Sequence, residues 1–182
     1  MRFYHGTNTV IDAIDLAKSR NRVDFGKGFY LTDIIGTAQI WAIRKVELEG
    51  EGIPTILCYE TGADLYTLHG QRFPDDPNLE WLNFICSNRR NVPPASTSKE
   101  PRHDFNWVSG AIADDKIVDV VAEYLRGETT DEEAIRRARA LPKTYQLSLN
   151  TAAAISYIDD TNVIYKQLKR GTWSQNWIIR KL

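Results

Sequence analysis

The order of hydrophobic and polar residues predicts strands and helices that follow one another along the chain. Residues of high strand propensity, some of them alternating between apolar and polar, predict strands at 2–5, 28–32, 54–60, 63–68, 144–150 and 161–168. Apolar residues at helical spacing predict helices at 33–47, 79–89, 117–125 and 131–140, with shorter helical segments at 10–17 and 151–158. Polar loops are expected at 18–24 and 91–104.

Length and charge narrow the class of protein. A chain of 182 residues fits one domain, 1–182, in which 169–182 forms a C-terminal tail. The tail holds Trp173 and Trp177 at helical spacing, and it either docks on the domain or binds a partner, with docking favoured. The net charge of −1 argues against a broad nucleic-acid-binding surface.

The two cysteines and the lack of long apolar runs indicate a reduced, cytoplasmic protein. Cys58 and Cys86 are too few for a disulfide framework and do not have metal-ligand spacing. The sequence shows neither a secretory signal nor an apolar run that would span a membrane. We therefore expect no membrane partner and no bound metal.

One glycine-rich stretch stands out as candidate chemistry. Gly26 and Gly28 bracket Lys27 and lead into Phe29 and Tyr30, at the start of a predicted strand. The stretch is either an ordinary glycine turn or a surface where a ligand approaches the backbone closely. Familiar phosphate-binding motifs and the serine-nucleophile elbow are not found in the sequence, so it supports neither chemistry.

Polar side chains at strand and helix ends give the other candidates. His5 ends the first predicted strand, where a lone histidine is more often structural than functional. Gln146, Ser148 and Asn150 share one face of the strand at 144–150, which meets either water or a polar cleft. The Asp114–Asp115 pair fits a helix cap better than a catalytic acid/base pair.

The order of these motifs resembles the ADP-ribosyltransferase superfamily, of the poly(ADP-ribose) polymerase and diphtheria-toxin type. The matching segments are His5-Gly6-Thr7, then Gly26-Lys27-Gly28-Phe29-Tyr30, then Trp41 eleven residues after the tyrosine, and Gln146 on a late strand. The stretch from Asp24 to Thr32 also resembles an uncharacterised bacterial family associated with toxin–antitoxin-like operons. Residues 50–140 carry no matching motif.

The resemblance implies an α+β fold, in which two small, mostly antiparallel sheets and flanking helices surround an NAD cleft. It implies that nicotinamide lies between Tyr30 and Trp41, that the Gly6 backbone holds the carboxamide, and that His5 bonds ribose hydroxyls. Arg20 is a candidate for the diphosphate, although an exposed surface arginine is an equal interpretation. The implied NAD-binding set is His5, Gly6, Thr7, Arg20, Gly26, Gly28, Phe29, Tyr30 and Trp41, and the implied catalytic set is His5, Tyr30 and Gln146.

Two residues depart from the pattern of that family. Ala38 stands where many members have a serine that also holds the carboxamide, and Gln146 stands where most have a glutamate. A glutamine amide accepts a hydrogen bond from a ribose hydroxyl but does not ionise. NAD cleavage stays plausible with a neutral acceptor, whereas elongation of a poly(ADP-ribose) chain needs the acid.

The expected function is therefore transfer of single ADP-ribose units from NAD to a protein or nucleic-acid acceptor. Such an enzyme would be a bacterial toxin or defence effector, with an antitoxin protein as a possible partner. One alternative is a catalytically inert NAD- or ADP-ribose-binding module, marked by Gln146. A more remote alternative is a toxin nuclease that uses His5 or His103.

Overall fold

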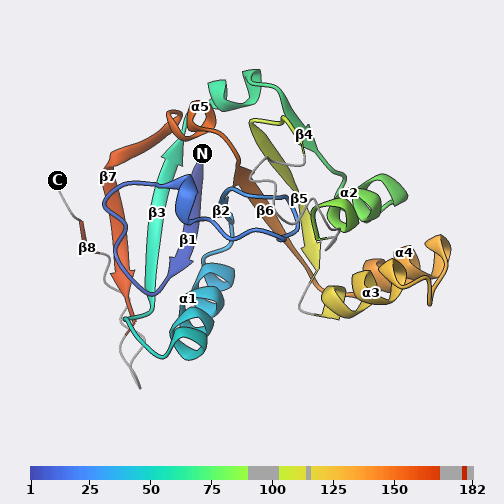
Figure 1. Cartoon of the computed structure of the whole chain (residues 1–182). Coiled ribbons are helices and arrows are strands. Elements are labelled where there is room, and N and C mark those ends of the chain that lie inside the picture. Colours follow the sequence, from blue (N-terminus) through green and yellow to red (C-terminus); the bar gives the residue numbers. More distant parts are fainter. Residues whose placement is uncertain (90–102, 114–115, 169–177, 180–182) are drawn as a thin grey trace.

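The computed structural model describes residues 1–89, 103–113, 116–168 and 178–179. It shows an α+β architecture with two four-stranded sheets (Figure 1). The first sheet has the order β1 (Arg2–Thr7), β3 (Thr55–Thr61), β7 (Ile158–Gln167) and β8 (Ile178–Ile179), all antiparallel. The second has the order β2 (Phe29–Leu31), β6 (Lys143–Leu149), β5 (Trp107–Ala113) and β4 (Gly70–Arg72), in which β4 and β5 are parallel.

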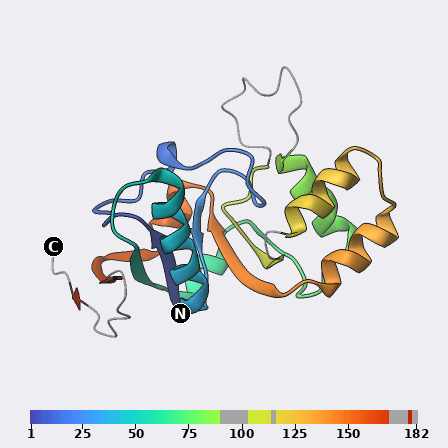
Figure 2. The same cartoon turned by 90° about the horizontal axis from the view of Figure 1, so that it is seen from below.

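Helices cover the two sheets separately. α1 (Ile35–Glu49) packs against β1, whereas α2 (Leu79–Arg89), α3 (Lys116–Leu125) and α4 (Asp131–Ala140) gather beside the second sheet (Figure 2). The short helices are η1 (Leu16–Lys18), η2 (Ala63–Thr67) and α5 (Ala152–Ile155). In the described part of the chain, no helix is long and apolar enough to cross a membrane.

Three hydrophobic clusters hold these layers together. The inner cluster lies between the sheets and draws Phe3, Leu57, Leu31 and Leu147 from four different strands. A second cluster joins the other face of the second sheet to α2, α3 and α4, and a third joins α1 to the first sheet. The face of each sheet that points away from the inner cluster is called here the outer face.

Among the described residues, one backbone pair joins the two sheets. Tyr4 of β1 and Thr32, just after β2, form an isolated antiparallel bridge. The Tyr4 N–H donates to Thr32 O at 2.8 Å, and the Thr32 N–H donates to Tyr4 O at 2.9 Å. Because paired residues share a face of a sheet, this bridge makes the two outer faces continuous.

Several predictions of secondary structure were wrong, including the helical segment 10–17, of which only Leu16–Lys18 is helical, and strand β4, which was not predicted. The segment 63–68 is the 3-10 helix η2 rather than a strand, because Leu65 and Leu68 are three residues apart and both pack inward. Strand β5 was not predicted, since Ser109 and Gly110 interrupt its apolar run; burial between β4 and β6 overrides that weak propensity. The predicted helix at 151–158 is too long and the predicted strand at 161–168 starts too late, because α5 ends at Ile155 and β7 already begins at Ile158.

The four long helices were predicted correctly, as were most strands. Gly50 ends α1 in the left-handed conformation, and the Thr130 side chain caps α4. The expected docking of the tail is confirmed for Ile178–Ile179, which pairs with β7 as strand β8. Trp173, Trp177, Asp114, Asp115 and most of the 91–104 loop lie outside the described residues.

Candidate functional site

Strands β1 and β2 separate directly after the Tyr4–Thr32 bridge. In a continuing antiparallel ladder the next backbone pair would join Gly6 to Tyr30, but the bridge is isolated. The Gly6 N–H and C=O point away from β3, as those of Tyr4 do, because backbone direction alternates along a strand. We call the place where the Gly6–Tyr30 pair is not formed the β1–β2 opening.

The His5 side chain takes the carbonyl that the missing pair would have used. His5 Nδ1 donates to Tyr30 O at 2.7 Å, because a carbonyl oxygen only accepts. This contact leaves His5 Nε2 as the unprotonated acceptor. The imidazole also stacks on Phe29, with 4.4 Å between ring centroids. The structure therefore fixes both the orientation and the tautomer of His5.

Burial keeps this histidine neutral. Burial is the main cause that lowers the pKa of His5, to about 4. The hydrogen bond to Tyr30 opposes that shift, and the positive charge of Lys45 adds to it. At neutral pH the ring is thus uncharged, with one nitrogen able to accept a hydrogen bond from a hydroxyl group. A histidine with so low a pKa is poorly suited to general acid catalysis near pH 7.

Tyr30 and Gln146 lie on the same, outer face of the second sheet. Tyr30 is paired with Ser148 on β6, and Gln146 is two residues from Ser148. Gln146 is only 8% exposed and is paired with Gly110 of β5. His5 and Phe29 point to the inner face instead, so the predicted catalytic residues approach the opening from two sides.

The Tyr30 hydroxyl is engaged with the turn that precedes β2. It donates to Gly26 O at 2.6 Å and accepts from the Phe25 N–H at 3.0 Å. Burial, reinforced by the charge of Asp24, raises the pKa of Tyr30 far above its ordinary value. The hydroxyl therefore stays protonated, and Tyr30 offers its ring rather than an ionised oxygen.

The carbonyl groups of residues 24–27 all accept hydrogen bonds from side chains. This segment, which we call the 24–27 turn, is held by Asn88 at Asp24 O, His103 and Asn150 at Phe25 O, Tyr30 at Gly26 O and Asn150 at Lys27 O, at 2.6–3.1 Å. Arg89 also forms an ion pair with the Asp24 carboxylate. The turn is thus fixed from several elements at once.

Both glycines of this motif are required by packing. Gly26 has a φ of +75°, which favours glycine. A Cβ atom on Gly28 would lie 2.3 Å from Ser148 Oγ and 2.8 Å from Asn150 Nδ2. The ordinary interpretation of the motif, a tight glycine turn, is therefore correct, and it does not conflict with a ligand on the open side.

Gly6 has a similar structural role on the other side of the opening. A Cβ atom there would lie 2.0 Å from Ala38 O and 2.9 Å from Ala42 N, so the backbone of α1 rests directly on β1. The small side chains of Ala38 and Ala42 permit this approach. This close packing explains the small side chain of Ala38, at the position where the resemblance implies a serine.

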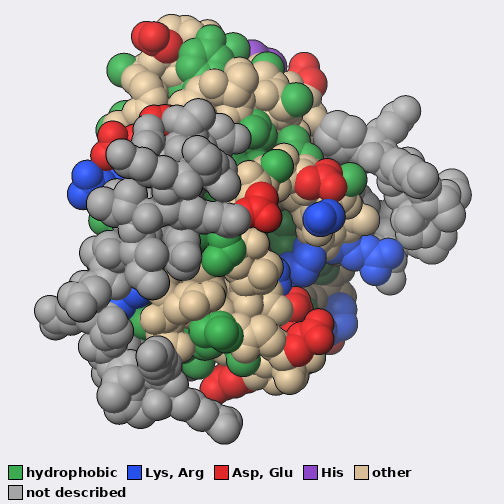
Figure 3. Space-filling view, turned by 90° about the vertical axis from the view of Figure 1, so that its left-hand side faces the viewer, with side chains coloured by type: hydrophobic (Ala, Val, Ile, Leu, Met, Phe, Trp, Pro, Cys, Tyr) green, Lys and Arg blue, Asp and Glu red, His purple; other side chains and the backbone are tan. Residues whose placement is uncertain are grey.

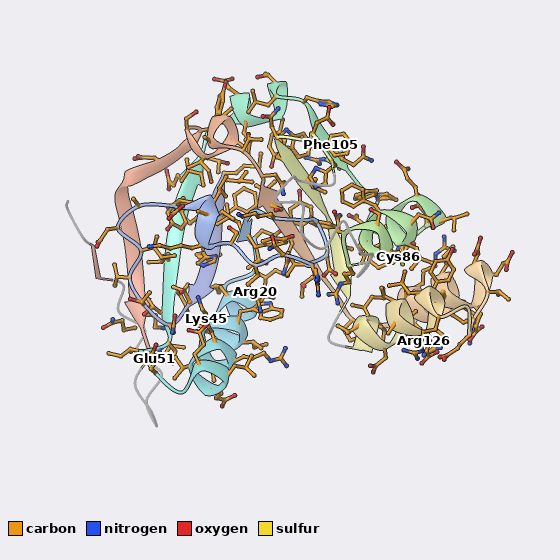
Figure 4. All side chains as sticks on the ribbon, in the orientation of Figure 1. Arg20, Lys45, Glu51, Cys86, Phe105 and Arg126 are labelled. Carbon is orange, nitrogen blue, oxygen red and sulfur yellow. The ribbon has the colours of Figure 1, made fainter. Side chains whose placement is uncertain are left out.

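Trp41 and Lys45 lie on one flank of α1. Lys45 Nζ lies 3.5 Å from Thr7 Oγ1, which shows that this flank reaches the C-terminal end of β1 (Figure 4). Trp41 is four residues before Lys45 and so lies one turn away on the same flank. Its half-buried ring carries the Arg44 guanidinium at 5.3 Å. Within the described part of the chain, the rings of Trp41 and Tyr30 are not in contact.

The structure brings most of the predicted residues together but not all of them. His5, Gly6, Thr7, Phe29 and Tyr30 border the opening, and Gly26 and Gly28 shape the adjoining turn. Trp41 lies on the helix that packs against β1, and Gln146 lies on β6, two residues from the partner of Tyr30. Arg20 is exposed in the loop between η1 and β2. Among the described residues, histidine, cysteine and carboxylate side chains do not form a group that could hold a metal ion.

Sequence reasoning missed Lys45, and it missed what Asn150 does. Asn150 was placed on the polar face of its strand, but its bonds to two carbonyls of the 24–27 turn depend on tertiary contacts. Lys45 follows Trp41 by one helical turn, which is the only signal that the sequence offers for it.

Comparison with protein families gives a match that covers most of the chain. The family model described as "Protein of unknown function (DUF3990)" matches residues 1–159. The chain belongs to the DUF3990 family. The matched region contains every residue that borders the opening. Comparisons of this DUF3990 chain with curated proteins and with solved structures gave no match.

Proposed function

We propose that the protein is an NAD-dependent mono-ADP-ribosyltransferase with the fold of that superfamily. The observation that carries the proposal is the unmade backbone pair between Gly6 and Tyr30, beside a His5 of fixed tautomer. A carboxamide has one donor and one acceptor side, which complement the N–H and C=O that Gly6 directs into the opening. Tyr30 lies beside the opening, and Gln146 is on the same outer face, two residues from the partner of Tyr30.

The proposed chemistry assigns a separate task to each residue. The rings of Tyr30 and Trp41 hold nicotinamide, and the neutral Nε2 of His5 accepts a hydrogen bond from a ribose hydroxyl. The Gln146 amide oxygen binds the ribose whose bond to nicotinamide breaks, and it favours the cation-like sugar of the transition state. ADP-ribose then passes to a nucleophilic atom of a protein or nucleic acid, which brings its own base.

A neutral glutamine limits what this site does to its acceptor. Because Gln146 does not take up a proton, the protein does not activate a hydroxyl acceptor, and it transfers single units rather than building chains. Acceptors that suit the site are thiolates, carboxylates or nucleobase nitrogens. On the face shown in Figure 3, acidic, basic and apolar side chains of the described residues all occur.

The test is incubation with labelled NAD and cell extract, using the wild type and the Trp41→Ala variant. Label transfer or nicotinamide release should occur in the wild type and should fall at least about tenfold in the variant, because one stacking wall is lost. Trp41 is half-buried, so the variant should fold, and Trp81→Ala would be unsuitable as a control because Trp81 is core. Tyr66→Ala, a half-buried aromatic of η2, is the matched control. If NAD is not consumed, or if Trp41→Ala consumes it normally, the transferase proposal fails.

One observation favours a second candidate, an inert NAD- or ADP-ribose-binding module. Gln146, which would bind the ribose whose bond to nicotinamide breaks, is neutral and buried. Such a module would bind NAD with the same dependence on Trp41 but would release no nicotinamide. Measuring both binding and nicotinamide release separates the two candidates.

A further inference from the structure

Lys45 is a cation beside the β1–β2 opening that the proposed chemistry does not use. It projects from α1 toward the C-terminal end of β1, where Nζ lies 3.5 Å from Thr7 Oγ1 (Figure 4). Its charge also contributes to the lowered pKa of His5. Lys45 is therefore close to His5 and Thr7, whose side chains are on the inner face of β1. The helix that carries Lys45 packs on the outer face.

The path of this side chain passes the open edge of β1. Helix α1 lies on the face of β1 to which a Cβ atom of Gly6 would point, because that atom would meet Ala38 O of the helix. Thr7 and His5 point to the opposite face of the strand by alternation. Strand β3 occupies the other edge of β1. A side chain that reaches from α1 to Thr7 therefore runs beside the edge where Gly6 presents its free backbone direction.

The Lys45 ammonium has no acidic partner in the described part of the chain. The ion pairs found there do not include it. The carboxylate one turn further along α1, Glu49, instead accepts a hydrogen bond from Asn8 Nδ2 at 2.7 Å. A half-buried lysine without a counter-charge loses hydration without recovering it, so an anionic ligand would be bound with advantage.

We propose that Lys45 binds the diphosphate of the dinucleotide and so makes the site prefer NAD and ADP-ribose over nicotinamide alone. This inference rests on the proposed function, in which nicotinamide and its ribose occupy the opening at Gly6 and His5. The diphosphate is the part of NAD that carries negative charge and lies beyond that ribose. Lys45 contacts Thr7 and its charge acts on His5, whereas Arg20 lies in an exposed loop.

The experiment measures the affinities of nicotinamide, ADP-ribose and inorganic pyrophosphate by titration calorimetry. Lys45→Ala should weaken ADP-ribose and pyrophosphate by about 10- to 100-fold, because a charge-assisted contact is lost. Nicotinamide should bind the variant within about twofold of the wild type. Lys45→Arg should keep most of the ADP-ribose affinity, and Lys18→Ala, an exposed lysine of η1, should leave all three unchanged.

The two proposals fail in different ways. Nicotinamide that does not bind the wild type overturns the proposed function. Pyrophosphate and ADP-ribose that do not bind, or that bind Lys45→Ala as tightly as the wild type, overturn the role of Lys45. The same holds if Arg20→Ala, and not Lys45→Ala, loses the diphosphate ligands. Weakening of nicotinamide by the same factor as ADP-ribose would also overturn it, because it would show general damage to the opening.

Discussion

At the scale of single residues, His5 makes the opening sensitive to acid. The folded protein holds the pKa of His5 at about 4, whereas an unfolded histidine has a pKa near 6.5. The unfolded chain therefore takes up a proton first as the pH falls. The stability that neutral His5 contributes is complete above about pH 6.5 and is lost progressively as the pH falls toward 4.

We predict that the free energy of unfolding falls by up to about 3 kcal/mol over this range, and that His5→Asn removes most of that loss. The asparagine amide still donates to Tyr30 O, but it does not titrate. Urea unfolding from about pH 7 to about pH 4.5 measures the effect. His103 also has a pKa lowered by burial, so His103→Asn is the necessary comparison. An unchanged pH dependence in His5→Asn would contradict the assignment.

Gln146 gives the second prediction at this scale. Replacing it with glutamate should raise nicotinamide release from NAD by about tenfold, because a charged acceptor binds the ribose hydroxyl more strongly than an amide does. Gln39→Glu, at a half-buried position of α1, adds the same charge on an element away from β6 and serves as the control. A Gln146→Glu variant that folds and binds NAD but releases nicotinamide no faster would speak against a catalytic role.

Several of these residues could be predicted from sequence, and the reason differs between them. His5, Tyr30 and Trp41 stand in a motif order, and strand alternation alone places Gln146 and Ser148 on one face. The role of Asn150 was hidden, because its two acceptors lie more than 120 residues earlier in the chain. Lys45 was hidden for a similar reason, since its contact with Thr7 exists only once α1 packs on β1.

At the scale of elements, the contact between α1 and β1 depends on one missing side chain. Gly6→Ala should lower the free energy of unfolding by about 3 kcal/mol, because its Cβ would overlap the backbone of Ala38. Gly36→Ala, in the first turn of α1, is the matched control, since no atom lies within 4 Å of its Cβ position. Chemical denaturation compares the two. Equal stabilities would show that α1 adjusts its distance from β1 at little cost.

The 24–27 turn gives a second prediction for an element. Asn150→Asp replaces a donor with a carboxylate that faces Phe25 O and Lys27 O, so it should cost about 2–4 kcal/mol of folding free energy. Asn83→Asp on the exposed side of α2 is the control. Denaturation measures the cost, and hydrogen exchange at Tyr30 should show whether the turn has loosened. A variant as stable as the wild type would mean that Asn150 does not hold the turn.

The helices were easier to predict than the strands for a physical reason. The apolar spacing and end residues of α1 and α4 are local signals, and Gly50 and Thr130 end and cap these helices. Strand β5 depends on neighbours that come from distant parts of the chain, and η2 uses apolar residues that also suit a strand. Pairing partners, rather than propensity, decide such segments.

At the scale of the whole molecule, a bound dinucleotide would link the two sheets. In the described part of the chain the sheets share the inner cluster but only one backbone bridge, and the proposed ligand contacts Gly6 on one sheet and Tyr30 on the other. NAD at about 100 times its dissociation constant should stabilise the fold by about 2.7 kcal/mol, which raises the melting temperature by about 5–10 °C. Thermal scans with NAD and with ADP-ribose measure this. A melting temperature that neither ligand raises would contradict binding by both the transferase and the inert module.

The fully bonded 24–27 turn also bears on how fast a ligand binds. All four carbonyls already have hydrogen-bond partners, so the turn is ordered when the protein folds. Ligand binding therefore does not have to order this segment, and its conformational entropy does not add to the free-energy cost of association. Binding on this side of the opening should therefore follow simple second-order kinetics, without a slow ordering phase. Differences in affinity between ligands on this side should then come from the dissociation rate constant.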